Sequence, residues 1–203
     1  MIKRITILIL WALSSIVTYA QTPGAILDSA IAAVDRAGGI TANYTVNDGQ
    51  QALSGRIAMK GTRFAMMSRD IKSWYDGNTQ WTFSTATGEV NITEPTEAEL
   101  QMTNPLATLR AFKASCVATK TAPRQTGCYS MTLAPKQRSQ IRFVVLTVDG
   151  KSSLPVRADV LMRDGTQATL TVTDVKTGQT LPDSSFVFNK NLVPEGTPIV
   201  DLR

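Results

Sequence analysis

The chain has no histidine, and this absence removes several classes of function at once. Without an imidazole there is no Ser-His-Asp or Cys-His nucleophilic catalysis, no histidine metal site, and no use of the commonest general base. The two cysteines alone do not make a zinc site. The sequence also lacks a phosphate loop and a dinucleotide fingerprint. It therefore predicts a non-catalytic protein that has no metal and no cofactor.

Charged residues are sparse, at 18% of the chain, and they do not cluster. Lys and Arg are scattered without stacking aromatics beside them, so we do not expect nucleic acid as a partner. A weak attraction to anionic membrane surfaces remains open. Glu94, Glu97 and Glu99 could in principle form a glycosidase pair. They fall on a predicted helix, where acidic residues at a solvated N-terminus are the better explanation.

Long hydrophobic runs are absent except at the N-terminus. Lys3 and Arg4 precede an apolar run over 5–17, and small residues follow up to Ala20, which is typical of a cleavable signal peptide. An uncleaved membrane anchor is the alternative, but the run is short of the roughly 20 residues that a span needs. We expect a signal peptide over 1–20 and a single domain over 21–203.

Cysteine is limited to Cys116 and Cys128, twelve positions apart. In a chain that leaves the cytoplasm, two cysteines at this spacing are expected to pair as a disulfide.

Most of the chain alternates apolar and polar residues with period two, which is typical of half-buried β-strands. Asp76-Gly77 between Trp74 and Trp81 predicts a β-hairpin. Period-3.6 segments predict a first helix over 24–37 and, after Pro95, a helical insertion opened by a Thr96–Glu99 capping box. Near the C-terminus we predict a helical turn over 182–185 and a short strand over 186–188. The fold class is mainly β (α+β), with about ten antiparallel strands. The alternation fits a nearly closed barrel around an apolar ligand, and it also fits a plain two-sheet sandwich.

The positive signal is apolar. Flexible methionines and large aromatics could mould around a hydrophobic guest, although ordinary core packing is the alternative for each one. The residues concerned are Met59, Met66, Met67, Met102, Met131, Met162, Phe64, Phe83, Phe112, Trp74 and Trp81.

Several motifs recur in an order that resembles a known family. WYDGNTQW is followed by EVNITEP, by a helix and by NPLATL; ITANYTV follows the first helix; and the chain ends in PDSSFVFNKNLVPEGTPIVDLR. In this order the sequence resembles the LolA-like periplasmic carriers of outer-membrane lipoproteins. The resemblance covers nearly all of 21–203.

The resemblance implies a strongly curved, incomplete antiparallel β-barrel with an N-terminal helix and a helical lid over an apolar cavity. Family carriers have an arginine that bonds to the lid backbone, and Arg63 is the candidate for this latch, in a stretch one residue shorter than the family pattern. By matching strand positions, the cavity candidates are Ile57, Met59, Phe64, Met66, Trp81 and Phe83. The lid candidates are Leu106, Leu109 and Phe112.

The same resemblance implies a soluble, monomeric carrier in the periplasm of a Gram-negative cell. Its partners would be acylated lipoproteins, an inner-membrane lipoprotein release complex and an outer-membrane acceptor. Two alternatives stay open: a periplasmic carrier or sensor of another lipid, and a secreted structural or adhesive β-domain whose apolar residues only fill a core. An enzyme is the third and least favoured alternative, because the chain has no histidine.

Overall fold

The computed structural model describes residues 22–203, so the predicted signal peptide lies outside the described residues. The helices are α1 (Pro23–Arg36), α2 (Glu97–Thr103) and α3 (Pro105–Ser115), with two 3-10 helices, η1 (Asp183–Phe186) and η2 (Lys190–Leu192). The strands are β1 (Gly39–Asn47), β2 (Ala52–Lys60), β3 (Arg63–Ser68), β4 (Ile71–Tyr75), β5 (Gln80–Ser84), β6 (Glu89–Thr93), β7 (Cys116–Thr121), β8 (Cys128–Pro135), β9 (Ile141–Asp149), β10 (Pro155–Met162), β11 (Gln167–Lys176) and β12 (Ile199–Asp201).

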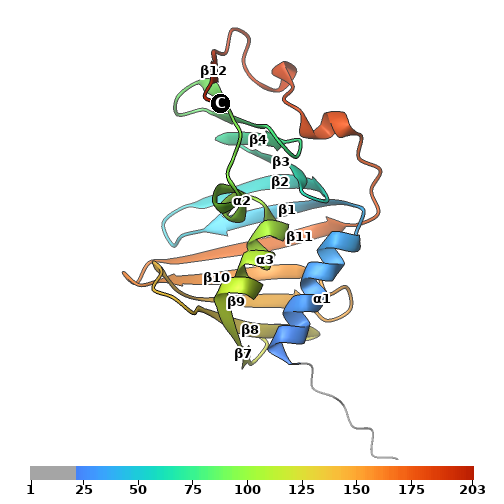
Figure 1. The fold of residues 1–203 in the computed structure, drawn as a ribbon, viewed down its shortest axis with the longest axis vertical. Coiled ribbons are helices and arrows are strands. Elements are labelled where there is room, and N and C mark those ends of the chain that lie inside the picture. The colour runs from blue at the N-terminus through green and yellow to red at the C-terminus, as the bar shows by residue number, and fades with distance from the viewer. Residues whose placement is uncertain (1–21) are drawn as a thin grey trace, which may run out of the picture.

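All of these strands belong to one curved sheet, in the order β12-β6-β5-β4-β3-β2-β1-β11-β10-β9-β8-β7. Neighbouring strands are antiparallel except for the parallel pair β12 and β6. The two end strands do not pair with each other, so the sheet stays open, as the prediction of an incomplete barrel requires. Figure 1 shows α1 and α3 lying across one face, which we call the inner face; the opposite face is the outer face. The sheet has twelve strands rather than about ten, because β7 and β12 are not predicted from the sequence.

The predicted hairpin is confirmed as β4 and β5. Trp74 lies opposite Trp81 in the antiparallel register. The turn between them is held by the Asp76 carboxylate, whose Oδ1 accepts the backbone N–H groups of Asn78 and Thr79, each at 2.9 Å. Gly77 adopts a φ of 110°, a conformation that side-chain-bearing residues rarely reach, which explains the Asp-Gly pair.

The helix α1 begins and ends as its sequence predicts. The Thr22 side chain accepts the N–H of Ala25 at 3.2 Å, and proline follows as the first helical residue. Gly38, with a φ of 71°, ends the segment. Its buried side chains, Ile26, Leu27, Ala30 and Val34, recur at helical spacing and pack on the inner face.

The C-terminal segment after β11 packs on the outer face. The predicted helical turn is confirmed as η1, but the strand predicted over 186–188 is wrong. Phe186 ends the 3-10 helix and is completely buried beside Trp74 and Phe83. Phe186 and Phe188 alternate with polar or smaller residues, which is the pattern of a strand, but here both rings pack against the outer face from an irregular segment. Phe188 packs edge-on against Trp74, with ring centroids 5.4 Å apart.

Candidate functional site

The inner face is an apolar surface built by the middle strands of the sheet. Ile57 and Met59 of β2 and Phe64 of β3 are buried in the same cluster as the inward side chains of α1 and α3. Met66 is partly buried against that cluster. The register explains the grouping, since Met59 lies opposite Phe64 and Ile57 lies opposite Met66 on adjacent strands. The structure therefore brings these four predicted cavity residues together on one face.

The helices α2 and α3, which we call the lid, lie over this surface (Figure 1). Leu106 and Leu109 of α3 are buried in the inner-face cluster, and Phe112 packs against it partly buried. The three positions share a helix face because they are three residues apart. The predicted lid residues thus belong to the same apolar cluster as four of the predicted cavity residues.

Trp81 and Phe83 are not on the inner face. Both belong to a second cluster, with Phe186, Trp74 and Ala65, on the outer face. Side chains alternate along a strand, so Trp74 faces opposite to its neighbour Tyr75, which packs in the inner-face cluster. Trp81 lies opposite Trp74 and shares its face. This placement corrects the prediction for these two residues: their aromatic side chains hold the C-terminal segment.

The inner face is polar where those aromatics were expected. Ser73 and Thr82 lie opposite each other on β4 and β5, with their hydroxyl oxygens 3.2 Å apart. The amide of Gln80 donates to both hydroxyls, at 3.1 Å to Ser73 and 3.3 Å to Thr82. The apolar surface therefore ends at Tyr75 of β4, beside Phe64, and a hydrogen-bonded polar strip borders it.

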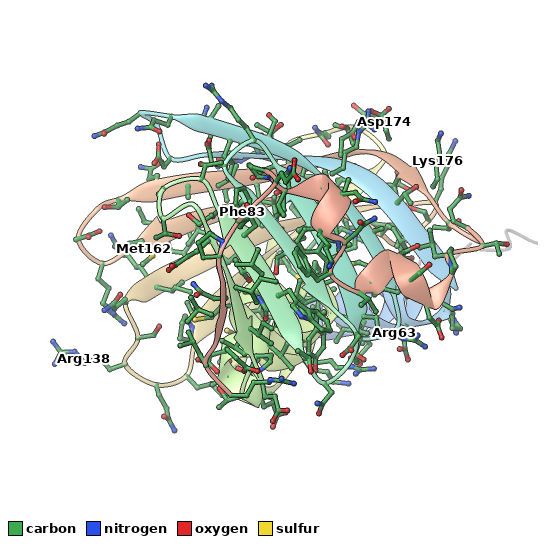
Figure 2. The ribbon with its side chains drawn as sticks, turned by 90° about the horizontal axis from the view of Figure 1, so that it is seen from above. Arg63, Phe83, Arg138, Met162, Asp174 and Lys176 are labelled. Atoms are coloured by element: carbon green, nitrogen blue, oxygen red, sulfur yellow. The ribbon has the colours of Figure 1, made fainter. Side chains whose placement is uncertain are left out.

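Arg63 does not contact the lid. Its guanidinium lies 2.6 Å from the carboxylate of Asp183 and 5.9 Å from the centre of the Phe186 ring. Figure 2 shows Arg63 on the side of the molecule where the C-terminal segment passes. The candidate latch from the sequence therefore ties down η1, because β3 presents this residue to the outer-face segment.

One hydrogen bond between the lid and the sheet comes from Asn104, a buried residue that joins α2 to α3. Its side-chain Oδ1 accepts the N–H groups of Leu106 at 2.9 Å and Ala107 at 3.1 Å, capping α3. Its Nδ2 donates to the carbonyl oxygen of Thr62, in the turn between β2 and β3, at 2.6 Å. The residue is only 1% exposed. The Asn-Pro pair predicts the start of α3, but nothing in the sequence indicates that the Asn104 side chain also bonds to Thr62.

Two exposed ion pairs join α1 to α3. Arg110 lies 3.2 Å from Asp35, and Lys113 lies 2.6 Å from Asp28. All four side chains are about half exposed, so each pair contributes at most about 1 kcal/mol. These two ion pairs therefore add little to the stability of the contact between α1 and α3.

Hollows open at both sides of the helices. One, of about 490 Å³, lies between the C-terminal end of α3 and the β8–β9 turn. The other, of about 880 Å³, lies between α1 and the β9–β10 turn. The apolar core occupies the inner face between α3 and the sheet.

The expected disulfide is absent, and the strand register explains why. Cys116 at the start of β7 lies opposite Pro135 at the end of β8, whereas Cys128 begins β8. Seven residues of extended strand separate Cys128 from Pro135, about 23 Å at 3.3 Å per residue. A disulfide needs Cα atoms within about 7 Å. Both cysteines are therefore free thiols.

Within residues 22–203, no three His, Cys, Asp or Glu side chains come together as a metal site would require. None of the helices in this part of the chain is long and apolar enough to cross a bilayer.

Sequence comparison identifies the family to which this architecture belongs. The family model described as outer membrane lipoprotein carrier protein LolA matches residues 13–166. The chain belongs to this LolA family. No curated protein matches the sequence significantly.

Solved structures share the LolA-like fold at low sequence identity. An uncharacterized conserved protein from Thermus thermophilus has a TM-score of 0.61 at 12% identity, over 87% of this chain and 96% of that chain. MucB in its complex with MucA from Pseudomonas aeruginosa has a TM-score of 0.50 at 9% identity, over 82% of this chain and 61% of the other. A LolA superfamily protein from Nitrosomonas europaea has a TM-score of 0.44 at 14% identity, over 83% and 99%. At identities this low, the first two structures indicate a common fold alone.

Proposed function

We propose that this protein is a soluble periplasmic carrier that binds the acyl chains of lipoproteins on its inner face and takes them from the inner to the outer membrane. The observation that supports this most is the lid: Leu106, Leu109 and Phe112 cover an apolar strand surface that also includes Ile57, Met59, Phe64 and Met66. If α3 moves away, both apolar surfaces become available to a guest.

The energetics favour such an exchange. Each buried methylene is worth about 0.8 kcal/mol, so an acyl chain gains several kcal/mol by entering an apolar site. That gain can replace the contacts that α3 loses on opening. The polar ties that also break are the hydrogen bond from Asn104 to the Thr62 carbonyl, two exposed ion pairs, and the hydrogen bonds that Lys136 donates to the carbonyls of Ala114 and Ser115 at the end of α3. A lid held mainly by apolar contact can therefore be displaced by an apolar guest.

The proposal includes the organisation of the chain and its partners. Residues 1–20 act as a cleavable signal peptide, and residues 21–203 form one monomeric carrier domain. An inner-membrane release complex loads it with acylated lipoproteins, and an outer-membrane acceptor receives them. The carrier performs no chemical reaction.

Lipid uptake by the mature protein, residues 21–203, tests this function. We expect a fluorescent fatty acid to bind with increased emission, and mass spectrometry to detect lipid that copurifies. Phe112→Glu places a charge at the edge of the inner face and should abolish uptake. Val117→Glu makes the same change at an exposed position on β7 and should leave uptake unchanged.

In cells, depletion of the protein should leave lipoproteins in the inner membrane. Uptake that is absent in the wild type, or equally reduced in Phe112→Glu and Val117→Glu, contradicts a carrier that uses this face. Thermal unfolding of both variants shows whether a loss of uptake reflects a loss of fold.

A further inference from the structure

The hollow at the C-terminal end of α3, which we call the α3-end cavity, has an apolar floor and a basic mouth. Its floor is formed by Phe112, Cys116, Leu133, Ile141 and Val144. Lys136 and Arg138, from the turn between β8 and β9, line its mouth. At about 490 Å³ it falls within the range of small-molecule sites, about 300–1,000 Å³.

The floor of this cavity is continuous with the inner face. Leu133 and Val144 are buried members of the inner-face cluster, and Phe112, Cys116 and Ile141 pack against it. Phe112 is both the last large apolar residue of the lid and part of the cavity wall. A chain bound in the cavity would therefore reach the space under α3 when Phe112 moves.

The mouth belongs to a basic end of the sheet. Arg163, in the turn between β10 and β11, donates its Nε–H to the carbonyl of Ser139 at 2.7 Å, so it lies against the β8–β9 turn. Arg142 is exposed near the start of β9. Among the ion pairs of residues 22–203, none involves Lys136, Arg138, Arg142 or Arg163.

The cations have little local compensation. Asp164 is the only carboxylate in the two turns, and its oxygen accepts the backbone N–H of Thr166 at 2.9 Å. Lys136 donates to the carbonyl of Ala114 at the end of α3. Figure 2 shows Arg138 standing out from its loop, at the same end of the sheet as Met162 and away from Asp174 and Lys176.

We propose that the α3-end cavity binds one acyl chain of an anionic phospholipid, with the phosphate at Lys136 and Arg138. This inference rests on the proposed lipid-binding function and names a ligand class for the same face. The apolar floor accepts the chain, and the unpaired cations select the headgroup. A headgroup without net charge gains little from these cations, because the choline of a phosphatidylcholine offsets its phosphate, whereas an anionic headgroup gains from each of them.

Binding of three probes to the mature protein, measured by titration calorimetry below the micelle concentration, tests the inference. Lysophosphatidylglycerol has the chain and the net charge, lysophosphatidylcholine has the same chain without net charge, and glycerol 3-phosphate has the charge without the chain. We expect the first to bind tightest, with its advantage over the second shrinking as salt rises. The third should not bind measurably.

Charge reversal locates the headgroup. Arg138→Glu should weaken lysophosphatidylglycerol binding by roughly fivefold or more, and affect lysophosphatidylcholine little. Lys176→Glu changes the net charge equally on the side of the molecule away from Arg138 (Figure 2) and should leave both affinities unchanged.

The two free cysteines report where the chain lies. In Cys128→Ser the remaining Cys116 lines the cavity, so saturating lysophosphatidylglycerol should slow its alkylation several-fold. In Cys116→Ser the remaining Cys128, which is outside the cavity lining, should react at the same rate with and without lipid.

Equal affinity for the two lysolipids, unprotected Cys116, or a larger effect of Lys176→Glu than of Arg138→Glu would overturn the inference while leaving lipid carriage intact. If no lysolipid and no fatty acid binds, the proposed function fails together with it.

Discussion

At the scale of single residues, Asn104 both caps α3 and bonds the lid to the sheet. Its carbonyl oxygen caps α3, and its amide donates to the carbonyl of Thr62 in the sheet. Both ends of the side chain are therefore satisfied although the residue is almost fully buried. The start of α3 is thus fixed to the turn between β2 and β3, which makes this residue the candidate latch in place of Arg63.

Asn104→Asp separates the cap from the bond to the sheet. A carboxylate still accepts the N–H groups of Leu106 and Ala107, but it has no N–H to donate to the Thr62 carbonyl. We expect amide exchange in α3 to speed up by about tenfold or more, since the Thr62 carbonyl loses a partner worth about 1–3 kcal/mol. Hydrogen exchange with mass spectrometry measures this. Arg63→Ala is the control and should speed exchange only around η1. Faster exchange of α3 in Arg63→Ala, or no change in Asn104→Asp, would restore the arginine as the latch.

At the scale of elements, α2 depends on its cap because none of its side chains is buried. The Glu99 carboxylate accepts the backbone N–H of Thr96 at 2.8 Å and its hydroxyl at 2.7 Å, while the Glu99 N–H is bonded to the Thr96 hydroxyl. The bonds from Thr96 lower the pKa of Glu99 below its usual range. Met102 is 86% exposed, and Leu100 is only partly buried against the inner-face cluster, so the cap supplements modest packing in this half of the lid.

This cap should make α2 sensitive to acid. The pKa of Glu99 is lower in the folded state than in the unfolded chain, so its stabilisation is complete above the unfolded value. It disappears as pH falls through the folded value. We expect the amide of Leu100, which bonds to the Thr96 carbonyl, to exchange faster, relative to intrinsic exchange, as pH falls below about 4. NMR can follow this. Glu99→Gln should abolish the acid step, and Glu97→Gln should retain it.

At the scale of elements, the sequence also led to a wrong prediction of the sheet face that Trp81 and Phe83 occupy. The Asp-Gly turn and the flanking aromatics correctly predict the hairpin. A strand, however, has two faces, and local alternation does not say which face meets the helices. Only the pairing of β3 with β4 decides this, because it places Phe64 beside Tyr75 and Ala65 beside Trp74.

At the scale of the whole molecule, the sheet has two apolar clusters with separate roles. The inner cluster lies between the strands and the helices, and the outer cluster anchors the C-terminal segment through Phe186. The outer cluster therefore supports the fold without meeting the lid. This division predicts that stability and lipid binding can be changed independently.

Phe186→Ala tests the division. The side chain is completely buried, so its removal should lower the free energy of unfolding by about 3–5 kcal/mol while the folded protein keeps its affinity for fatty acid. Leu109→Ala should also destabilise the protein, by about 2–5 kcal/mol, and should change lipid affinity as well. Urea unfolding and fluorescent lipid titration measure the two quantities. A changed affinity in Phe186→Ala would mean that the clusters are coupled.

The sequence by itself determined the class of fold, the hairpin, the first helix, the capping box of α2, and the grouping of Ile57, Met59 and Phe64 with the lid. These follow from periodicity and from local hydrogen bonding, which act over a few residues, and from motif order. The tertiary structure alone decided which face Trp81 and Phe83 occupy, that Arg63 binds Asp183, that Asn104 reaches Thr62, and that the two cysteines stay apart. Each of these depends on strand pairing between distant segments, which local pattern does not encode.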